Sequence, residues 1–468
     1  MYFFALAIFL LTYAVIVSEK VHRTIAALIG AGLLMLSGVL TVEDAIKYID
    51  WNTIGLLIGM MIIVGITRNT GVFEYLAIRA AKMVKGNPVK IMMALALVTA
   101  LASALLDNVT TVLLIVPVTF AIARQLKVNP IPILVAEIIS SNIGGTATLI
   151  GDPPNIMIGS STGLGFMDFV FNLAPVIVVV HVITVTLLIL IYRKHLVTTP
   201  ELQKGIMKMD EKEELKDISL LKQCLVVLSL TILGFVIHQY IHLESSVIAL
   251  SGASLLLLLS SRHDPEQALH AVEWPVIFFF AGLFLVVGGI EKVGIIEAIA
   301  RFTIDVTNGM MVPAGMLILW VSAIASAFVD NIPFVATMIP LIKDMGQLGM
   351  SGDLNFLWWS LSLGACLGGN GTIIGASANV VVVGMAEKRG FPITFISYMK
   401  VAFPAMLVSI VLCMCYMLFW YHYHGLVSIL GTLAVGVVLA LITIPINNSL
   451  SKSAISAISE KKPVKGNR

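Results

Sequence analysis

Two Asp-Asn pairs interrupt long apolar runs at matching places in the sequence. Asp107-Asn108 lies in SALLDNVTTVLLIVP, and Asp330-Asn331 lies 223 residues later in SAFVDNIPFVATMIP. A carboxylate within a membrane is costly and usually serves function, because hydrocarbon does not solvate its charge. Asp is also a favoured N-cap residue, so helix capping alone would explain both pairs, and the two roles can coexist. We predict that Asp107 and Asp330 bind or couple an ion.

A glycine-rich stretch follows each pair, GGTATLIGDPPN at 144–155 and GGNGTIIGASAN at 368–379. Glycine permits φ angles that other residues avoid, which favours an unwound segment inside a membrane helix. Amides and carbonyls freed in this way can bind a solute near the membrane midplane. Beside the two Asp-Asn pairs, the candidates for substrate or ion binding are Thr110, Thr111, Asn142, Gly144, Gly145, Thr146, Thr148, Asp152, Asn155, Gly368, Gly369, Asn370, Thr372 and Asn379.

Four carboxylates are candidates for coupling to protons or cations: Asp107, Glu137, Asp152 and Asp330. Asp152 and Glu137 have no acidic counterpart in the second half of the chain, which indicates that coupling is concentrated in the first half. Glu137 could instead bond to a neighbouring Ser or Asn. The two Asp-Asn pairs are candidate ligands for Na⁺, the identity of any metal stays open, and no cofactor is predicted.

Basic residues are scarce where the solute should bind. No Lys or Arg is predicted near the membrane midplane, so a bound anion would depend on backbone amides and helix N-termini. His181 is the one basic candidate deep in a predicted span, and a packed histidine is the simpler interpretation. A neutral hydroxylated solute, or a cation held by Asp107 and Asp330, fits the residues equally well.

The composition is that of a polytopic membrane protein. Of the 468 residues, 58% are hydrophobic and 12% are charged, and the mean hydropathy is +0.99. A soluble domain could not bury this much apolar surface, whereas a bilayer accepts it. A net charge of +2 gives no reason to expect a nucleic-acid partner. No GxxxxGK[ST] motif occurs, which disfavours ATP-driven pumping and leaves gradient-driven transport or a channel.

The apolar segments predict an all-α protein with about eleven transmembrane helices and two re-entrant hairpins. Each hairpin is a pair of apolar segments too short or too closely spaced to be two ordinary spans. With this count the N-terminus lies outside and the C-terminus inside, because most Lys and Arg then face the inner side. The predicted spans are 1–17, 24–40, 52–67, 132–158, 170–192, 220–241, 245–260, 275–290, 355–386, 401–423 and 426–446, and the hairpins are 91–123 and 312–342.

The chain also repeats itself. DWNTIGLLIGMMIIVGITRNTGVFEYLAIRA from Asp50 matches EWPVIFFFAGLFLVVGGIEKVGIIEAIARF from Glu273, and the two Asp-Asn pairs share the same offset. An odd number of crossings between equivalent helices makes the repeats inverted, as in many secondary transporters. The predicted organisation is a first repeat at 1–192 with hairpin 91–123 and broken helix 132–158, a solvated cytoplasmic linker at 193–219, a second repeat at 220–423 with hairpin 312–342 and broken helix 355–386, an extra transmembrane helix at 424–446 and a cytoplasmic tail at 447–468.

Four motifs resemble those of the ion transporter superfamily, in its arsenite permease, NhaD antiporter and P-protein (pink-eyed dilution) group. They are LDNVTT, NIGGTATLIGDPPN, DNIPFVATMIP and GACLGGNGTIIGASANVV. The residues of these motifs are most similar to those of the P-protein branch. The resemblance covers about 24–423. It implies a homodimer in which a scaffold supports a mobile domain of hairpins and broken helices that moves like an elevator. It also implies a site built from both hairpin tips and both broken helices.

The sequence therefore predicts a secondary transporter of a small inorganic anion or oxyanion in the cell membrane, coupled to protons or Na⁺, and not an enzyme. Na⁺/H⁺ antiport is the nearest alternative, because of the carboxylates at the tips. Transport of a di- or tricarboxylate is less favoured, since no basic side chain awaits its carboxylates. An intramembrane aspartyl protease with Asp107 and Asp330 as a dyad is a remote alternative, because the usual GxGD loop is missing.

Overall fold

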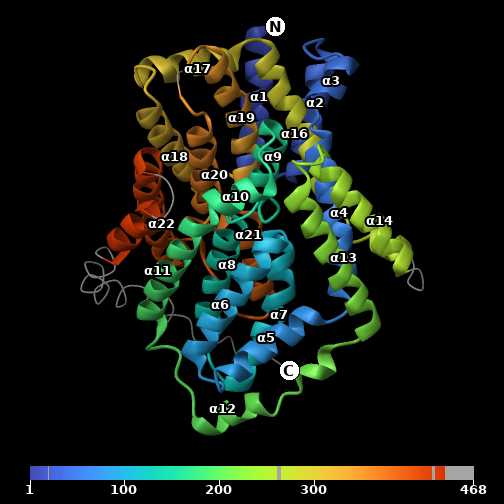
Figure 1. Cartoon of the computed structure of the whole chain (residues 1–468), viewed down its shortest axis with the longest axis vertical. Coiled ribbons are helices and arrows are strands. Elements are labelled where there is room, and N and C mark those ends of the chain that lie inside the picture. The colour runs from blue at the N-terminus through green and yellow to red at the C-terminus, as the bar shows by residue number, and fades with distance from the viewer. Residues whose placement is uncertain (19, 261–264, 351, 424–426, 438–468) are drawn as a thin grey trace.

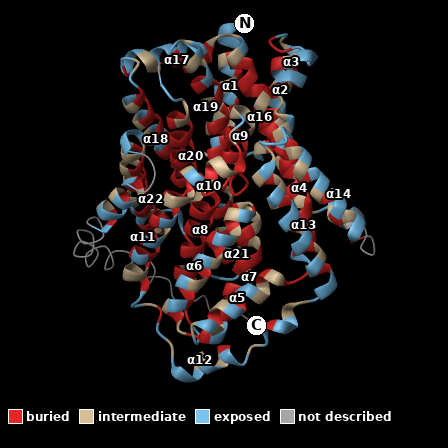
Figure 2. Cartoon of the chain, viewed as in Figure 1, coloured by how far each residue is buried: buried red, intermediate tan, exposed pale blue. Residues whose placement is uncertain are grey.

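The computed structural model describes residues 1–468 except 19, 261–264, 351, 424–426 and 438–468 (Figure 1). The described part is helical and contains no β-strand. Eight of the described helices are long and apolar enough to cross a membrane, by length and composition. Buried residues are concentrated along the middle of the molecule (Figure 2), and many large apolar side chains are exposed. An outer surface this apolar suits a protein surrounded by lipid.

The first half of the chain forms eleven helices. They are α1 (Tyr2–Ser18), α2 (Arg23–Leu36), α3 (Val42–Tyr48), α4 (Trp51–Arg68), α5 (Val72–Met83), α6 (Pro88–Leu105), α7 (Asn108–Leu126), α8 (Ile131–Gly145), α9 (Pro153–Thr162), α10 (Phe166–Asn172) and α11 (Ala174–Tyr192).

A linker and the second half follow. The linker contains α12 (Pro200–Met207) and the 3-10 turn η1 (Glu211–Glu214). The second half contains α13 (Ile218–Ile237), α14 (Ser245–Leu259), α15 (Pro265–Leu269), α16 (Trp274–Lys292), α17 (Ile295–Val306), α18 (Met311–Phe328), α19 (Asn331–Gln347), α20 (Asn355–Gly368), the 3-10 turn η2 (Ile373–Gly375), α21 (Ser377–Lys388) and α22 (Phe395–Tyr423).

Segments that match in sequence have similar local structure. Gly71 before α5 and Gly294 before α17 both adopt the left-handed conformation, with φ of 78° and 79°. Glycine suits this position because a side chain would be strained there. In Figure 1, α5 lies towards the lower end of the molecule and α17 at the upper end. The two matched segments thus lie at opposite ends of the structure.

At each predicted hairpin two helices are joined at an Asp, but their arms are longer than expected, and three of the four (α6, α7 and α18) are long and apolar enough to cross a membrane. The first pair, α6 and α7, extends over 88–126 instead of 91–123, and the second, α18 and α19, over 311–347 instead of 312–342. Helix caps rather than hydropathy set the limits of the first pair. Asn87 caps α6 with a 3.1 Å bond from the Lys90 amide, and Lys127 ends α7 in the left-handed conformation.

Both predicted broken helices are broken. The first is interrupted between α8 and α9 at 146–152, and the second between α20 and α21 at 369–376, where η2 forms a single 3-10 turn. The glycines were expected to cause the breaks by adopting φ angles that other residues avoid. This reason was wrong, because none of the glycines in the two breaks has a positive φ angle.

These glycines instead permit close packing between helices. A Cβ atom on Gly144 would lie 2.1 Å from the carbonyl oxygen of Ala100, and one on Gly368 would lie 2.5 Å from that of Ala323. Such distances are impossible for real side chains, so only glycine lets α8 approach α6, and α20 approach α18, this closely.

The two halves interlock by exchanging partners. Helix α2 of the first half packs against α16, while α14 of the second half packs against α4. In the same way α9 packs against α19, and α21 packs against α7. Each hairpin is therefore in contact with the broken helix of the other half, which brings the tips and breaks of both halves together.

The linker is docked rather than fully solvated. Glu211 is buried, and its carboxylate lies 2.5 Å from Lys82 Nζ and 3.1 Å from Arg79 Nη1 on α5. The Lys82 and Arg79 cations lower the pKa of Glu211 to about 2. The Lys216 amide also donates to the Thr70 carbonyl at 3.1 Å. The linker thus packs against α5 and against α7, the second arm of the first hairpin.

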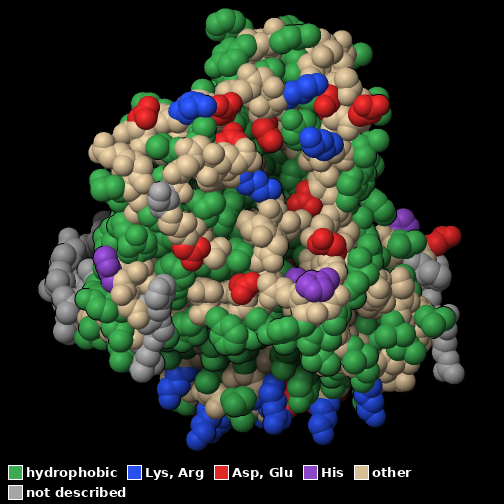
Figure 3. Space-filling model, turned by 45° about the horizontal axis from the view of Figure 1, so that its top comes forward, with side chains coloured by type: hydrophobic (Ala, Val, Ile, Leu, Met, Phe, Trp, Pro, Cys, Tyr) green, Lys and Arg blue, Asp and Glu red, His purple; other side chains and the backbone are tan. Residues whose placement is uncertain are grey.

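Charged side chains gather at the two ends of the molecule. Figure 3 shows Lys and Arg along the lower edge and charges of both signs over the upper part, with many hydrophobic side chains between. At the upper end Lys292 lies 2.6 Å from Asp44, and Arg301 lies 2.7 Å from Glu297. The Lys292 ammonium and the Thr41 cap hold the pKa of Asp44 well below its usual range.

The predicted C-terminal helix at 424–446 is described only in part. Val427–Val437 is a short apolar helix, and Gly436 lies against Ile183 of α11. The remainder of that helix and the predicted tail at 447–468 lie outside the described residues.

Candidate functional site

The first hairpin tip is fixed by Asp107, which caps α7. Its Oδ1 accepts a 2.8 Å hydrogen bond from the Thr110 amide, and its Oδ2 accepts one from the Thr110 hydroxyl. Within the described part of the chain no basic side chain pairs with Asp107. The Thr111 hydroxyl is buried and has no hydrogen-bond partner among the described residues. The expected capping role is present, and the carboxylate has no counter-ion.

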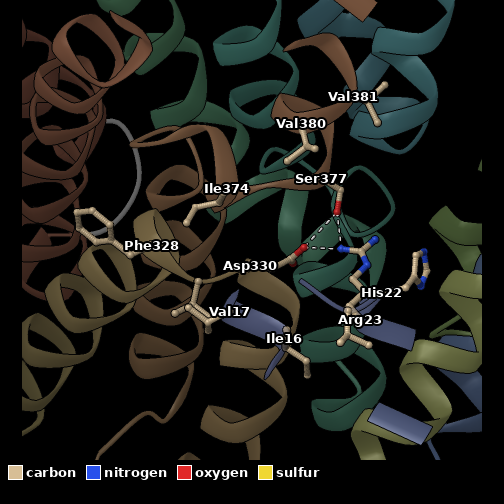
Figure 4. A pocket seen from close by; sticks show the side chains of 12 residues that line it. Ile16, Val17, His22, Arg23, Phe328, Asp330, Ile374, Ser377, Val380 and Val381 are labelled. Carbon is tan, nitrogen blue, oxygen red and sulfur yellow. Dashed lines mark hydrogen bonds and ion pairs between the residues drawn. The ribbon is translucent and has the colours of Figure 1, made fainter. Parts of the chain in front are cut away.

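The second tip has a different environment. Asp330 caps α19 through a 3.1 Å bond from the Ile332 amide, but its Oδ2 also lies 2.5 Å from Arg23 Nη1 at the start of α2. Ser377, the first residue of α21, donates to the same oxygen at 3.1 Å and accepts from Arg23 at 2.7 Å. Figure 4 shows the three side chains pointing toward one another.

A buried network of amide side chains joins the two halves. Asn108, beside Asp107, donates to Asn142 Oδ1 at 3.0 Å. The Asn142 amide in turn donates to the Oδ1 atoms of Asn370 and Asn379, both at 2.9 Å. These four side chains are at most 4% exposed, and the Asn370 amide nitrogen has no partner among the described residues. Asn142 is therefore the hub that connects the first tip to the second break.

An asparagine stabilises each break in the same way. The side-chain amides of Asn155 and Asn379 each donate to two carbonyls of the unwound segment, at 2.7 to 3.1 Å: Thr146 and Thr148 in the first break, Gly369 and Thr372 in the second. Buried carbonyls need such partners once the helical bonds are lost.

A threonine hydroxyl then ties each break to its own hairpin. Thr148 donates to the Ala104 carbonyl on α6, and Thr372 donates to the Ala327 carbonyl on α18, both at 2.5 Å. Within the first break, the Thr146 hydroxyl donates to the Asn142 carbonyl at 2.7 Å. These hydroxyls are used in holding the backbone.

Asp152 connects the first break to the second tip. It is fully buried at the start of α9, and the Asn331 amide lies 3.3 Å and 3.4 Å from its two carboxylate oxygens. A carboxylate from one half therefore faces an amide from the other.

These groups surround a cavity of about 110 Å³ between the two tips. A cavity of this size holds several water molecules or a small ion. Its apolar walls include Leu57 and Met61 of α4. Its polar lining residues are Arg23, Asp107, Asn108, Asp152, Glu273, Asn331 and Ser377.

Carboxylates outnumber cations around this cavity. Asp107, Asp152 and Glu273 face a single basic residue, Arg23, whose guanidinium is already paired with Asp330. No group of three His, Cys, Asp or Glu side chains within the described residues is placed to hold a metal ion. The site thus has proton acceptors, amide donors and one guanidinium.

Four of the residues expected at the site line the cavity: Asp107, Asn108, Asp152 and Asn331. Asp330 lies beyond Arg23 and lines a neighbouring cavity of about 270 Å³. The others form the frame around the cavity rather than its wall. They are Thr110, Thr111, Asn142, Gly144, Gly145, Thr146, Thr148, Asn155, Gly368, Gly369, Asn370, Thr372 and Asn379.

Glu137 is not at the cavity. It is fully buried on α8, where its Oε1 accepts a 2.5 Å bond from the Thr119 hydroxyl of α7 and its Oε2 has no partner among the described residues. His181 Nε2 lies 3.2 Å from the Ser140 hydroxyl. The packed role expected for His181 therefore agrees with its position.

Three polar lining residues were not expected from the sequence: Arg23, Glu273 and Ser377. The prediction that no Lys or Arg reaches the midplane site was wrong, because Arg23 extends from the start of α2 to the second tip. The sequence could have indicated Glu273, because it is the first residue of the second repeated segment, as Asp50 is of the first. No such signal marks Arg23, because a basic residue at the end of an apolar segment is typical of any membrane helix.

Comparison with known proteins identifies the family. The family model described as "Citrate transporter" (CitMHS) matches residues 13–364. The chain belongs to the citrate transporter family. It is therefore a secondary transporter and a multi-pass integral membrane protein, not an enzyme, and a protease dyad at Asp107 and Asp330 has no further support.

Relatives extend over most of the chain. An uncharacterized transporter of Mycobacterium bovis is 44% identical over 427 residues, covering 90% of this chain and 99% of that protein. The P protein of Mus musculus is 36% identical over 499 residues, covering 88% of this chain and 60% of that protein. The expected kinship with P proteins is confirmed.

A solved structure shares the fold. The YdaH transporter of Alcanivorax borkumensis superposes with a TM-score of 0.57 at 16% identity, covering 91% of this chain and 98% of the other. This citrate transporter family member thus has the fold of a known membrane transporter, built here around the cavity between its two tips.

Proposed function

We propose that the protein is a secondary active transporter of a small inorganic anion or oxyanion, coupled to protons or Na⁺, and that the cavity between the tips is its transport site. The observation that carries the proposal is the meeting of Arg23 with Asp107, Asp152 and Glu273 around about 110 Å³. The guanidinium supplies attraction for an anion, and the carboxylates supply places for coupling protons. The asparagine amides add neutral donors.

Two inverted repeats account for how this site is assembled. In support, α5 and α17 lie at opposite ends of the molecule, and the tips approach the cavity with exchanged partners. The lower end carries the row of Lys and Arg, so we place that end, with the linker, on the cytoplasmic side. The proposal keeps the predicted repeats at 1–192 and 220–423, about eleven spans and an external N-terminus.

An elevator motion suits the two kinds of packing. Helices α2, α4, α14 and α16 pack on one another in exchanged pairs and would form the fixed scaffold, as half of a homodimer. The hairpins and broken helices pack tightly through Gly144 and Gly368 and would move as one body. The cavity has walls from both groups, as alternating access requires.

A second candidate is Na⁺/H⁺ antiport, which the excess of carboxylates around the cavity favours, with the Asp-Asn pairs as Na⁺ ligands. A third is transport of a di- or tricarboxylate. The family's description and the guanidinium of Arg23 favour it, because the sequence-based objection to it assumed that no basic residue was present.

Flux through proteoliposomes distinguishes these candidates. Purified protein is given a pH or Na⁺ gradient, and internal pH is followed while chloride, arsenite, phosphate, citrate and Na⁺ are offered in turn. Proton movement that requires chloride, arsenite or phosphate is the expected result. Movement that requires only citrate or only Na⁺ would replace the proposal by the corresponding alternative.

A further inference from the structure

Arg23 joins a scaffold helix, α2, to the carboxylate of the second tip, Asp330. Its Nη1 makes both recorded bonds, to Asp330 and to Ser377, and the guanidinium carbon lies 5.0 Å from the centre of the buried Phe279 ring on α16. No partner lies within hydrogen-bond distance of Nε or Nη2 among the described residues. Two of the three guanidinium nitrogens thus have hydrogen-bonding capacity in reserve.

The guanidinium also lies between two cavities. Arg23 lines the cavity of about 110 Å³ with Asp107 and Asp152, and it lines the cavity of about 270 Å³ with Asp330. The side chains of Arg23 and Asp330 retain 26% and 13% of their exposure, so solute and water can reach the pair. A small shift of the guanidinium would therefore exchange one neighbour for another without moving α2.

We propose that Asp330 and the transported anion compete for Arg23, so that protonation of Asp330 is what admits the anion. This inference rests on the proposed function. A proton from the aqueous phase binds the Asp330 carboxylate, and the neutral acid no longer holds the guanidinium. The anion then binds Nη1 and the unpaired Nη2 in a two-pronged contact. When the anion leaves on the opposite side of the membrane, Asp330 releases its proton to that side as well. The carboxylate then pairs with Arg23 again.

The surrounding charges make this competition strict. His22 adjoins Arg23 in the larger cavity, and Asp107, Asp152 and Glu273 face the smaller one. Whenever they are ionised, the three carboxylates oppose an anion, so the guanidinium that Asp330 releases is the group at this cavity that attracts one. One proton then moves with each anion in the same direction through this pair. A purely structural ion pair would instead leave anion binding independent of Asp330.

The experiment compares wild type with Asp330→Asn, Arg23→Gln and Arg23→Lys in proteoliposomes, with radiolabelled phosphate, chloride and citrate as probes and internal pH recorded in parallel. Asp330→Asn keeps an N-cap but removes the competitor, so anion flux should continue without proton movement. Arg23→Gln should lose anion flux at least ~10-fold, the factor that corresponds to about 1.4 kcal/mol. Arg23→Lys should keep flux with a raised KM, because an ammonium cannot offer the two parallel N–H donors of a guanidinium.

Arg301→Gln is the matched control, since it removes an ion pair with Glu297 far from the cavities and should leave flux unchanged. In the wild type, the KM for the transported anion should fall as the pH on the uptake side falls. This measurement uses the wild-type protein alone, so it does not depend on whether any variant folds. A KM independent of pH, or an Asp330→Asn protein that keeps proton-coupled flux, would overturn the inference. If the wild type moves none of the anion probes, the proposed function itself fails.

Discussion

The two hairpin tips are equivalent in sequence but differ in electrostatics. The Asp107 carboxylate accepts hydrogen bonds from Thr110 of its own helix, whereas the Asp330 carboxylate pairs with Arg23 from α2. The repeat offset of 223 residues places Ser246 of α14 where Arg23 stands in α2, and serine carries no cation. The two tips are thus alike in sequence, but within the described residues only the second has a counter-ion.

This difference suggests a division of labour. In our proposal Asp330 exchanges between a proton and the Arg23 guanidinium, while Asp107 lines the cavity directly. Four experiments, described in decreasing order of expected effect, test this difference and the packing that supports it.

Asp107→Asn removes the charged carboxylate that would bind the coupling ion or proton at the cavity. Because a hydrogen bond to a charged group is worth up to about 3 kcal/mol, coupled flux should fall by roughly 100-fold. Asparagine caps helices as well as aspartate does, so the protein should fold normally. Substrate flux and size-exclusion chromatography of the same preparation measure both properties. Wild-type flux in this variant would mean that Asp107 is a cap and nothing more.

Asn142→Ala should destabilise the protein by about 3 kcal/mol, because Asn108, Asn370 and Asn379 would each lose a buried partner. The equivalent position in the second half is Cys366, a weak thiol donor that lies 3.6 Å from Asn155 Oδ1 and also contacts Asp152. Cys366→Ala should therefore cost less. Thermal unfolding in detergent measures both variants, and equal losses would deny Asn142 its place as the hub of the network.

Gly144→Ala should destabilise the α6–α8 contact by about 2 kcal/mol through overpacking, and Gly368→Ala should do so slightly less, because its clash is 2.5 Å rather than 2.1 Å. Gly384 on α21 has nothing within 4 Å of its missing Cβ and provides the control. Gly384→Ala should be neutral or stabilising. Similar melting temperatures for Gly144→Ala and Gly384→Ala would contradict the packing account.

Glu211→Gln should loosen the linker from α5 and have the smallest effect. Because the pKa of Glu211 is lowered to about 2, its contribution is present above the unfolded pKa of about 4.3 and is lost as the pH falls through about 2. Limited proteolysis of the linker should become faster in the variant at neutral pH, and in the wild type only in that acidic range. Glu213→Gln, next to it on η1, serves as the control.

Much of the fold could be predicted from the sequence because membrane helices are set by hydropathy and polar interruptions. The Asp-Asn tips and the glycine-rich stretches located both hairpins and both breaks. The lengths of the arms could not be read from hydropathy, because caps such as Asn87 extend helices beyond their apolar cores. The role of Gly144 was also missed, since contact with Ala100 depends on which helices meet.

The candidate site was predicted in its composition but not in its electrostatics. Asp107, Asn108, Asp152 and Asn331 were expected and do line the cavity. Arg23 could not be expected, because it lies 307 residues from Asp330 in the chain and only the exchanged packing of α2 on α16 brings it there. Glu273 was visible as the start of a repeat, but its approach to the cavity depends on the same packing.

The most direct measurement places Asp107→Asn and Asp330→Asn beside wild type in one proteoliposome assay that records internal pH and uptake of labelled phosphate, chloride or citrate together. Our account predicts that Asp107→Asn loses both signals, while Asp330→Asn keeps anion uptake and loses proton movement. Identical behaviour of the two variants would contradict the claim that the tips have separate roles.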